Sequence, residues 1–177
     1  MKKWLIKLFF LGYLIMFSFT NAETIEVGQP APDFELIDQH GEAHSLSNYA
    51  DQWVVLYFYP KDDTPGCTKE ACAFRDDYRT ISAQNTQVLG VSIDSQESHA
   101  QFAEKYQLPF PLLSDKNGLV ARQYQSLTSL GPLKFAKRHT FIIGPKSQIQ
   151  MIYRKVDAST HSQQILRDLK KLQSEKN

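Results

Sequence analysis

Apolar and polar residues along the chain follow the periods of alternating strands and helices. Three continuous apolar runs are typical of strands buried on both faces of a sheet, namely Trp53–Tyr59, Val88–Ile93 and Thr140–Ile143. Between them, apolar residues recur at helical spacing from Ala71 to Ile81 and again from Ser95 to Tyr106. We therefore expect one α/β domain with a central mixed β-sheet flanked by helices.

Shorter patterns complete the expected topology. A hairpin at the edge of a sheet is predicted around the turn residues Asp38–Gly41. The other short elements that we expect are a helical turn at Ser45–Tyr49, an extended piece at Phe110–Leu113, a helix through Val120 to Tyr124, an antiparallel strand at Ile149–Arg154 and a final helix at Thr160–Gln173. Ser126–Lys137 is the least regular stretch, and we predict that it is a loop bordering a site.

The first 22 residues have the layout of a secretory signal peptide. A basic start at Met1–Lys3 precedes an apolar run at Leu8–Phe19 and small residues at Thr20–Ala22. The run is short for a bilayer span, which needs about 20 residues. We expect residues 1–22 to be removed from a domain at residues 23–177, and the protein to reside in the periplasm or cell envelope. Retention as a membrane anchor through residues 4–19 is the alternative.

Charge and cysteine content narrow the function. The whole chain carries a net charge of +1, and without the leader 17 basic residues face 19 acidic ones. Because no long basic run appears, we expect no nucleic-acid partner. The 155 residues after the leader suffice to bury a core without covalent staples. Two cysteines are too few for a disulfide framework, so we expect their role to be local.

Both cysteines follow the first buried strand. Thr64 suits a helix cap, Pro65 suits the first helical position, and Gly66 lets other groups approach closely. Cys67 then falls in the first turn of a helix, where unpaired N–H groups and the helix dipole favour an anion. The thiolate is the nucleophilic form of cysteine. The alternative is a small buried residue at an ordinary helix start.

The spacing of Cys67 and Cys72 distinguishes these alternatives. Five residues of α-helix rise about 7.5 Å, which places the two Cα atoms roughly 8 to 9 Å apart. A disulfide reaches only about 7 Å between Cα atoms. Either the segment is permanently non-helical and holds a structural bridge, or the helix unwinds each time the bridge forms. Because closing so short a loop stabilises little, we favour a redox cycle.

These residues resemble those of a known family. Pro60, Thr64 and Cys67 stand in the Pro-x-x-x-Thr-x-x-Cys pattern of the peroxiredoxins, and Cys72 five residues later resembles the peroxiredoxin Q or bacterioferritin-comigratory subfamily. The resemblance extends from Val27 to Leu169. It implies a thioredoxin-like fold and the reduction of hydrogen peroxide or organic hydroperoxides, with no cofactor or metal.

The resemblance also implies a role for each cysteine. Cys67 would be the peroxidatic cysteine, which attacks the peroxide and becomes a sulfenic acid. Cys72 would be the resolving cysteine, which condenses with it to a Cys67–Cys72 disulfide. A thioredoxin-like dithiol would then reduce the bridge. We expect a monomer.

Three further residues would complete the implied site. Thr64 and Arg138 would hold the peroxide and stabilise the charge that develops on its oxygens. Pro60 would shield the sulfur from water. Glu70 would either orient Arg138 or occupy a solvated helix position.

Other functions remain as alternatives. A copper-handling module on the same fold would bind metal through the two cysteines and His139, with the soft ligands that copper prefers. A thiol–disulfide exchange protein is disfavoured because the chain has no Cys-x-x-Cys motif. A non-enzymatic envelope protein with a structural disulfide is the third alternative.

Overall fold

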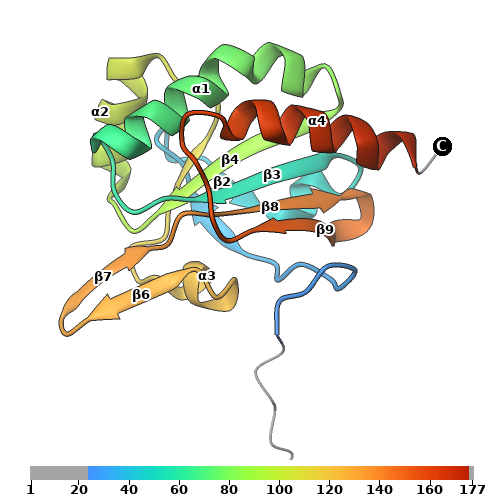
Figure 1. The fold of residues 1–177 in the computed structure, drawn as a ribbon. Helices are drawn as coiled ribbons and strands as arrows, with labels where there is room; N and C mark the ends of the chain where they lie inside the picture. Colours follow the sequence, from blue (N-terminus) through green and yellow to red (C-terminus); the bar gives the residue numbers. More distant parts are fainter. Residues whose placement is uncertain (1–23, 176–177) are drawn as a thin grey trace, which may run out of the picture.

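A five-stranded mixed sheet forms the centre of the protein (Figure 1). The computed structural model describes residues 24–175, so the predicted leader lies outside the described residues. The strands follow the order β5-β4-β3-β8-β9, with bounds β3 (Trp53–Phe58), β4 (Thr86–Ser92), β5 (Leu112–Ser114), β8 (His139–Gly144) and β9 (Gln148–Tyr153). β3 pairs parallel with β4 and antiparallel with β8. The expected mixed sheet is confirmed.

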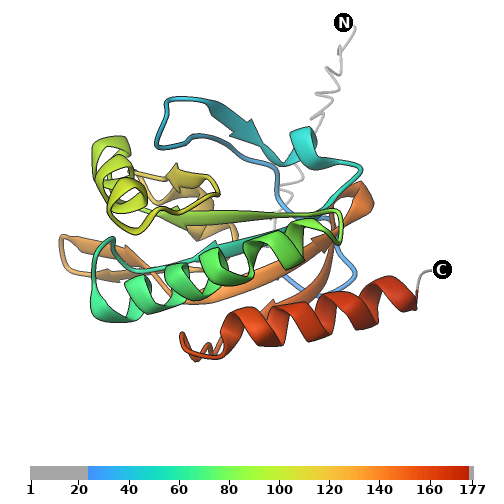
Figure 2. The same ribbon diagram turned by 90° about the horizontal axis from the view of Figure 1, so that it is seen from above.

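Three helices cover one face of this sheet. α1 (Pro65–Ser82) and α4 (His161–Ser174) lie side by side across it, and α2 (Gln96–Tyr106) packs beside them (Figures 1 and 2). Alternate residues of β3 point toward these helices and share one apolar cluster with them, including Val55, Tyr57, Phe74, Ile81, Phe102, Ile165 and Leu169. The helical spacing read from the sequence therefore marks the buried faces of the helices.

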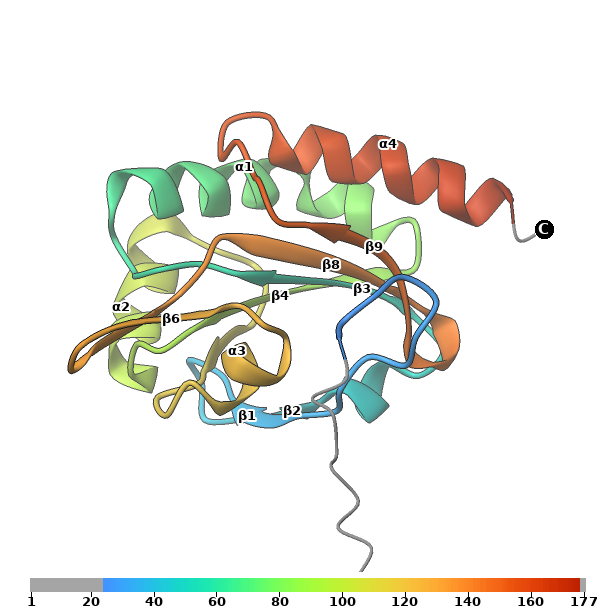
Figure 3. The same cartoon turned by 60° about the horizontal axis from the view of Figure 1, so that its bottom comes forward.

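The opposite face is covered by short elements (Figure 3). They are β1 (Glu35–Ile37), β2 (Ala43–Ser45), the 3₁₀ turn η1 (Leu46–Tyr49) and α3 (Leu119–Gln123). The remaining residues of β3, Val54, Leu56 and Phe58, pack against Leu46 and Tyr124 from this layer. The hairpin around Asp38 is present, but our placement at the edge of a sheet is wrong. β1 and β2 form a separate two-stranded sheet, since β5 and β9 occupy the edges of the central one.

The predicted loop at Ser126–Lys137 is also wrong, because most of it forms a hairpin. β6 (Leu127–Leu130) pairs antiparallel with β7 (Leu133–Ala136) around Gly131, whose φ is +59°. Leu130 and Leu133 near the tip are 64% and 67% exposed. Strands this exposed need no alternating apolar pattern, which explains why the sequence did not indicate them.

The last segments agree with the sequence pattern. The 3₁₀ turn η2 (Pro145–Ser147) reverses the chain between β8 and β9.

Between residues 24 and 175, no helix has both the length and the apolar content needed to cross a bilayer.

Candidate active site

The pairing of β3 with β8 brings the two ends of the candidate site together. β3 ends at Phe58, which pairs with His139, the first residue of β8. Arg138, just before β8, therefore lies beside the loop that leads from β3 into α1. This antiparallel register explains how Arg138 and Cys67, 71 positions apart in the chain, come into contact.

The expected helix start at Cys67 is confirmed. α1 begins with Pro65 at its first position, Thr64 stands at the N-cap with φ −85° and ψ 149°, and Cys67 lies in the first turn. The predicted capping by the Thr64 side chain is wrong. Its hydroxyl donates instead to the Lys61 carbonyl oxygen at 3.1 Å, which braces the loop before the helix.

The guanidinium of Arg138 links Cys67 to a buried carboxylate. Nη2 of Arg138 donates to the Cys67 sulfur at 3.3 Å, and Nη1 donates to Oε2 of Glu70. Cys67 is 2% exposed and Glu70 only 1%, so both groups are shielded from water. A Cβ atom on Gly66 would lie 3.2 Å from Nη2 of Arg138, so a larger residue before the cysteine would crowd the guanidinium. Of the two roles considered for Glu70, the structure supports the one of orienting Arg138.

Burial affects the pKa values of Glu70 and Arg138 differently. Burial raises the pKa of Glu70 to about 7, and the nearby Arg138 only partly opposes the rise. Burial alone would lower the pKa of Arg138, but Glu70 and Cys67 outweigh it and raise that pKa above its ordinary value. The difference arises because Glu70 is more deeply buried than Arg138, whose side chain is 22% exposed. Arg138 therefore keeps its positive charge beside the sulfur.

Cys72 lies on the same helix as Cys67 and is half-buried. α1 is continuous across both cysteines, and both are free thiols. This arrangement agrees with the spacing argument, which allows no bridge while the helix is intact. The Cys67–Cys72 disulfide itself stays a prediction.

Pro60, at the start of the loop between β3 and α1, borders a hollow of about 530 Å³. The hollow extends between this loop and the β6–β7 hairpin, and its lining includes Ile93, Leu133 and Phe135. The stretch Ser126–Lys137 thus borders the hollow next to Pro60, as a hairpin. Lys61, Asp94 and Lys134 also border it, but most of its exposed surface is apolar, which suits a hydrocarbon group.

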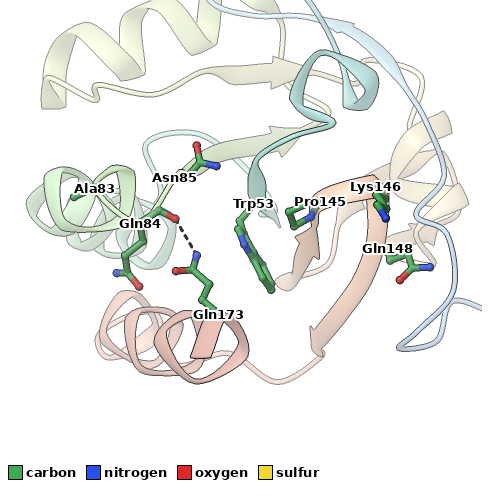
Figure 4. A pocket seen from close by; sticks show the side chains of 8 residues that line it. All are labelled: Trp53, Ala83, Gln84, Asn85, Pro145, Lys146, Gln148 and Gln173. Atoms are coloured by element: carbon green, nitrogen blue, oxygen red, sulfur yellow. Dashed lines mark hydrogen bonds between the residues drawn. The ribbon is translucent and has the colours of Figure 1, made fainter. Parts of the chain in front are cut away.

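A second hollow, of about 650 Å³, lies far from this chemistry (Figure 4). Trp53 points into it from the first position of β3, and Gln148 and Gln173 flank it. The six residues of β3 span about 20 Å at the usual rise per residue, so this hollow lies at the opposite end of the strand from Cys67. Volume alone would have misplaced the site.

The sequence analysis overlooked a buried polar cluster beside the site. The Asp62 carboxylate, 7% exposed, bonds to Tyr59, Ser98 and His99. Asp62 stands in a run of turn-forming residues, where an aspartate is ordinary, and His99 is 37 positions away. No local pattern connects them.

The geometry does not support the copper-handling alternative. His139 bonds through Nδ1 to Ser126 at 3.0 Å and lies 3.3 Å from Arg154, whose charge would repel a cation. Within residues 24–175, the one group of three side chains close enough to hold a metal is Asp38, Glu42 and His44, in the β1–β2 hairpin. Asp38 there already accepts two backbone N–H bonds of its own turn.

Comparison with known proteins agrees with this geometry. The AhpC/TSA family profile matches residues 27–152. Peroxiredoxin Bcp of Bacillus subtilis is 44% identical over 155 residues, which cover 83% of this chain and 96% of that protein. The putative peroxiredoxin bcp of Coxiella burnetii is 44% identical over 147 residues, covering 81% and 97%.

Solved structures show the same relationship. Peroxidoxin BcpB of Mycobacterium tuberculosis superposes with a TM-score of 0.78 at 36% identity, covering 82% of this chain and 97% of that one. The bacterioferritin comigratory protein of Xanthomonas campestris, studied for its alkyl peroxide reduction activity, gives a TM-score of 0.73 at 33% identity, covering 77% and 90%. The expected thioredoxin-like fold is confirmed. The chain therefore belongs to the AhpC/TSA family, among the peroxiredoxins named Bcp or Q, and it is a thiol peroxidase.

Proposed function

We propose that this protein reduces hydrogen peroxide and organic hydroperoxides through Cys67, with Cys72 as the resolving thiol and a thioredoxin-like dithiol as the reductant. The observation that carries the proposal is the contact of Arg138 with Cys67 at 3.3 Å, in the first turn of α1. The cation and the helix start both favour the anionic sulfur that must attack the peroxide.

In the first step the Cys67 thiolate attacks the nearer peroxide oxygen and breaks the O–O bond. Cys67 becomes a sulfenic acid, and the other oxygen leaves as hydroxide or alkoxide, which takes a proton to give water or an alcohol. Arg138 has N–H groups directed at this position and offsets the negative charge on the departing oxygen. Glu70 holds the guanidinium in place by accepting a hydrogen bond from its other terminal nitrogen, Nη1 of Arg138.

Thr64 and Pro60 complete the site. The Thr64 hydroxyl now donates to the Lys61 carbonyl, but rotation about χ1 would let it bond an incoming peroxide oxygen instead. Pro60 lacks an N–H donor and borders the apolar hollow, so it keeps water from the sulfur on that side. That hollow would accept the organic group of a hydroperoxide, which supports organic as well as inorganic peroxides as substrates.

In the second step the Cys72 thiol attacks the sulfenic sulfur of Cys67. A disulfide forms and water leaves, after α1 has unwound locally between the two cysteines. An external dithiol then attacks the disulfide, which restores both thiols and oxidises the dithiol to its own disulfide. The half-buried position of Cys72 favours it as the sulfur that the reductant reaches first.

Location and assembly are further parts of the proposal. The basic start, the apolar run at Leu8–Phe19 and the small residues at Thr20–Ala22 support export to the periplasm or cell envelope, with the leader removed. We propose that the exported protein acts as a monomer. Amino-terminal sequencing of protein from the envelope fraction tests removal of the leader, and light scattering of the purified protein tests the monomer.

A single-turnover experiment tests the chemistry. The reduced protein is mixed with one equivalent of hydrogen peroxide in a stopped-flow instrument, quenched with an alkylating agent and digested. Mass spectrometry should find the peptide containing Cys67 and Cys72 lighter by two hydrogens and protected from alkylation. If the quench alkylates both thiols after the peroxide has been consumed, the proposal is overturned.

A further inference from the structure

The loop that delivers Cys67 is fastened by a carboxylate that takes no part in the chemistry described above. Asp62 lies in the loop between β3 and α1 and is 7% exposed. Its Oδ1 accepts the Tyr59 hydroxyl at 2.8 Å, and its Oδ2 accepts the Ser98 hydroxyl at 2.7 Å. Oδ2 also lies 2.8 Å from Nδ1 of His99. Three donors, one from the residue after β3 and two from α2, therefore converge on one buried carboxylate.

The backbone of Asp62 is held as well. Its N–H donates to Oδ2 of Asp94 at 2.9 Å, and the same oxygen accepts the Ser92 hydroxyl at 2.6 Å. Ser92 is the last residue of β4, and Asp94 precedes α2. Side chain and backbone together tie this one residue to the ends of two strands and to the start of a helix.

The members of this cluster depend on Asp62. Nε2 of His99 is buried and has no hydrogen-bond partner among the described residues, so the ring is hydrogen-bonded only through Nδ1, to Asp62 and Tyr59. Burial raises the pKa of Tyr59 well above its ordinary value, and the Asp62 charge acts in the same direction, so the hydroxyl stays a donor. Burying a carboxylate is unfavourable even with good partners, and apolar side chains would fill the space at lower cost. This cost favours a cluster that holds the loop in one conformation over one that merely fills space.

The rest of α1 is fastened beyond Cys72. Phe74 and Ile81 are fully buried against the sheet and α4. Between the Asp62 cluster and Phe74 lies one short segment, residues 65–73, and it contains both cysteines. The unwinding that disulfide formation requires is thus bounded by an upstream and a downstream anchor.

We infer that Asp62, held by Tyr59, Ser98 and His99, is a positioning residue that keeps Cys67 beside Arg138 for peroxide attack and restrains the unwinding of residues 65–73. The inference rests on the proposed Cys67–Cys72 cycle. It has opposite consequences for the two steps. A weaker cluster slows the attack on peroxide, which needs the folded site, and does not slow formation of the disulfide, which needs the unfolded one.

The restraint also governs a side reaction. A sulfenic acid that has not yet met Cys72 can attack a second peroxide, which oxidises Cys67 to the sulfinic acid and releases water or an alcohol. A cluster that holds the folded site prolongs the time available for this reaction. Loosening it should lower the yield of sulfinic acid at high peroxide.

The test separates the two steps in Ser98→Ala, Tyr59→Phe and Asp62→Asn. Rapid quenching and mass spectrometry follow the sulfenic acid, the disulfide and the sulfinic acid in each reduced variant. We expect the second-order rate constant with peroxide to fall about tenfold in Asp62→Asn and less in the other two. The first-order rate constant for disulfide formation should stay equal or rise, and the sulfinic yield should fall.

Asp63→Asn is the matched control. Asp63 is the next residue, and its carboxylate is 48% exposed and bonds to Lys105 and Tyr106 at the surface. Asp63 also joins this loop to α2, but its bonds are exposed to water and therefore contribute little, so both rate constants should stay within about twofold of the unmodified protein. Rate constants that fall together in the cluster variants, or that match those of Asp63→Asn, would overturn the inference. If the unmodified protein formed no Cys67–Cys72 disulfide, the proposed function itself would fail. If Asp62→Asn does not fold, Ser98→Ala and Tyr59→Phe decide.

Discussion

At one end of β3 Trp53 lines an open hollow, whereas at the other end the Cys67 thiol contacts Arg138, which is paired with the buried Glu70. The first end has the space but little chemistry, since amide side chains surround it and Lys146 supplies its one charge. The second end holds the buried carboxylates Glu70 and Asp62, and the hollow beside it, near Pro60, is smaller, at about 530 Å³. The contrast shows that charged groups kept from water mark the reactive end of this sheet better than volume does.

The largest expected effect is at the sulfur itself. Cys67→Ser should abolish peroxidase turnover, by at least about 10³-fold, because the hydroxyl is a far weaker nucleophile than the thiolate. Cys72→Ser is the control, since it should still react once with peroxide at the normal rate and then stop as a sulfenic acid that dimedone traps. Coupled peroxide consumption measures both. Full activity of Cys67→Ser with a dithiol reductant would show that the active site does not lie at this end of the sheet.

The next effect concerns the bridging guanidinium. Arg138→Gln should lower the rate constant of Cys67 with peroxide about 10²-fold, roughly 2.7 kcal/mol of barrier, because a donor to the developing charge is lost. Arg138→Lys should recover little, since one ammonium cannot bond Glu70 and Cys67 as the two guanidinium nitrogens do.

Arg154→Gln provides a matched loss of a guanidinium. Arg154 lies near His139 and over the ring of Phe141, away from the sulfur. Its replacement should change the peroxide rate constant less than about threefold. Equal losses in Arg138→Gln and Arg154→Gln would mean that general positive charge, and not the contact at 3.3 Å, promotes the reaction.

Some of this end of the sheet was predictable from the sequence. The apolar run of β3 and the Thr64-Pro65-Gly66 helix start are local signals, and they located Cys67 in the first turn of α1 correctly. Arg138 was placed at the site by resemblance, and the register of β8 on β3 supplies the physical reason. Local signals sufficed here because the chemistry depends on where a strand ends and a helix begins.

What escaped prediction depends on contacts between distant segments. Asp62 and His99 meet only after β3 and α2 have packed. An aspartate in a run of turn-forming residues gives no sign in the sequence that its carboxylate is buried or which residue it bonds. The Thr64 hydroxyl had two acceptable partners, and loop geometry selected the Lys61 carbonyl over the helix. The β6–β7 hairpin is too exposed to carry a buried-strand pattern, although Gly131 and Pro132 mark its turn.

A third prediction uses the buried imidazole beneath the site. Burial lowers the pKa of His161 to about 4, and the charge of Arg138 acts in the same direction. The unfolded chain, with a histidine pKa near 6.5, therefore binds more protons than the folded protein between these values. Stability is lost as the pH falls through this window, by about 2 kcal/mol from this residue at pH 4.5.

Urea unfolding at pH 7.5 and pH 4.5, compared between the unmodified protein and His161→Gln, separates this loss from the contributions of other groups such as Glu70. His161→Gln keeps a polar group that can reach Thr140, the partner of Nε2 at 2.8 Å, and should lose less stability on acidification than the unmodified protein. The residues that line the Trp53 hollow include no group with a pKa between 4 and 7, so that end should contribute nothing to the difference. An unchanged pH dependence in His161→Gln would contradict the prediction.

A smaller effect should appear at the hollow beside Pro60. Leu133→Asp places a charge in its apolar lining and should lower the rate with an organic hydroperoxide about fivefold relative to hydrogen peroxide. Leu130→Asp is the control, because Leu130 is equally exposed on the same hairpin but is absent from the lining. The ratio of the two peroxide rates in each variant is the measurement, and a shift of equal size in both would assign the effect to the charge of the hairpin alone.

The smallest effect on the rate with peroxide is expected from changes at the Trp53 end of β3. Gln148 is exposed on β9 and lines the Trp53 hollow, so Gln148→Trp would fill that space and Gln148→Ala would widen it. Exposed substitutions of this kind change stability by about 0.5 kcal/mol or less. Because β3 is paired on both sides and buried along its whole length, we expect it to transmit no change to the Cys67 end. Both variants should react with peroxide within about twofold of the unmodified protein, since surface changes this far apart usually act independently. A larger change, in opposite directions for filling and widening, would show that the two ends of the strand are coupled and that the hollow regulates the thiol.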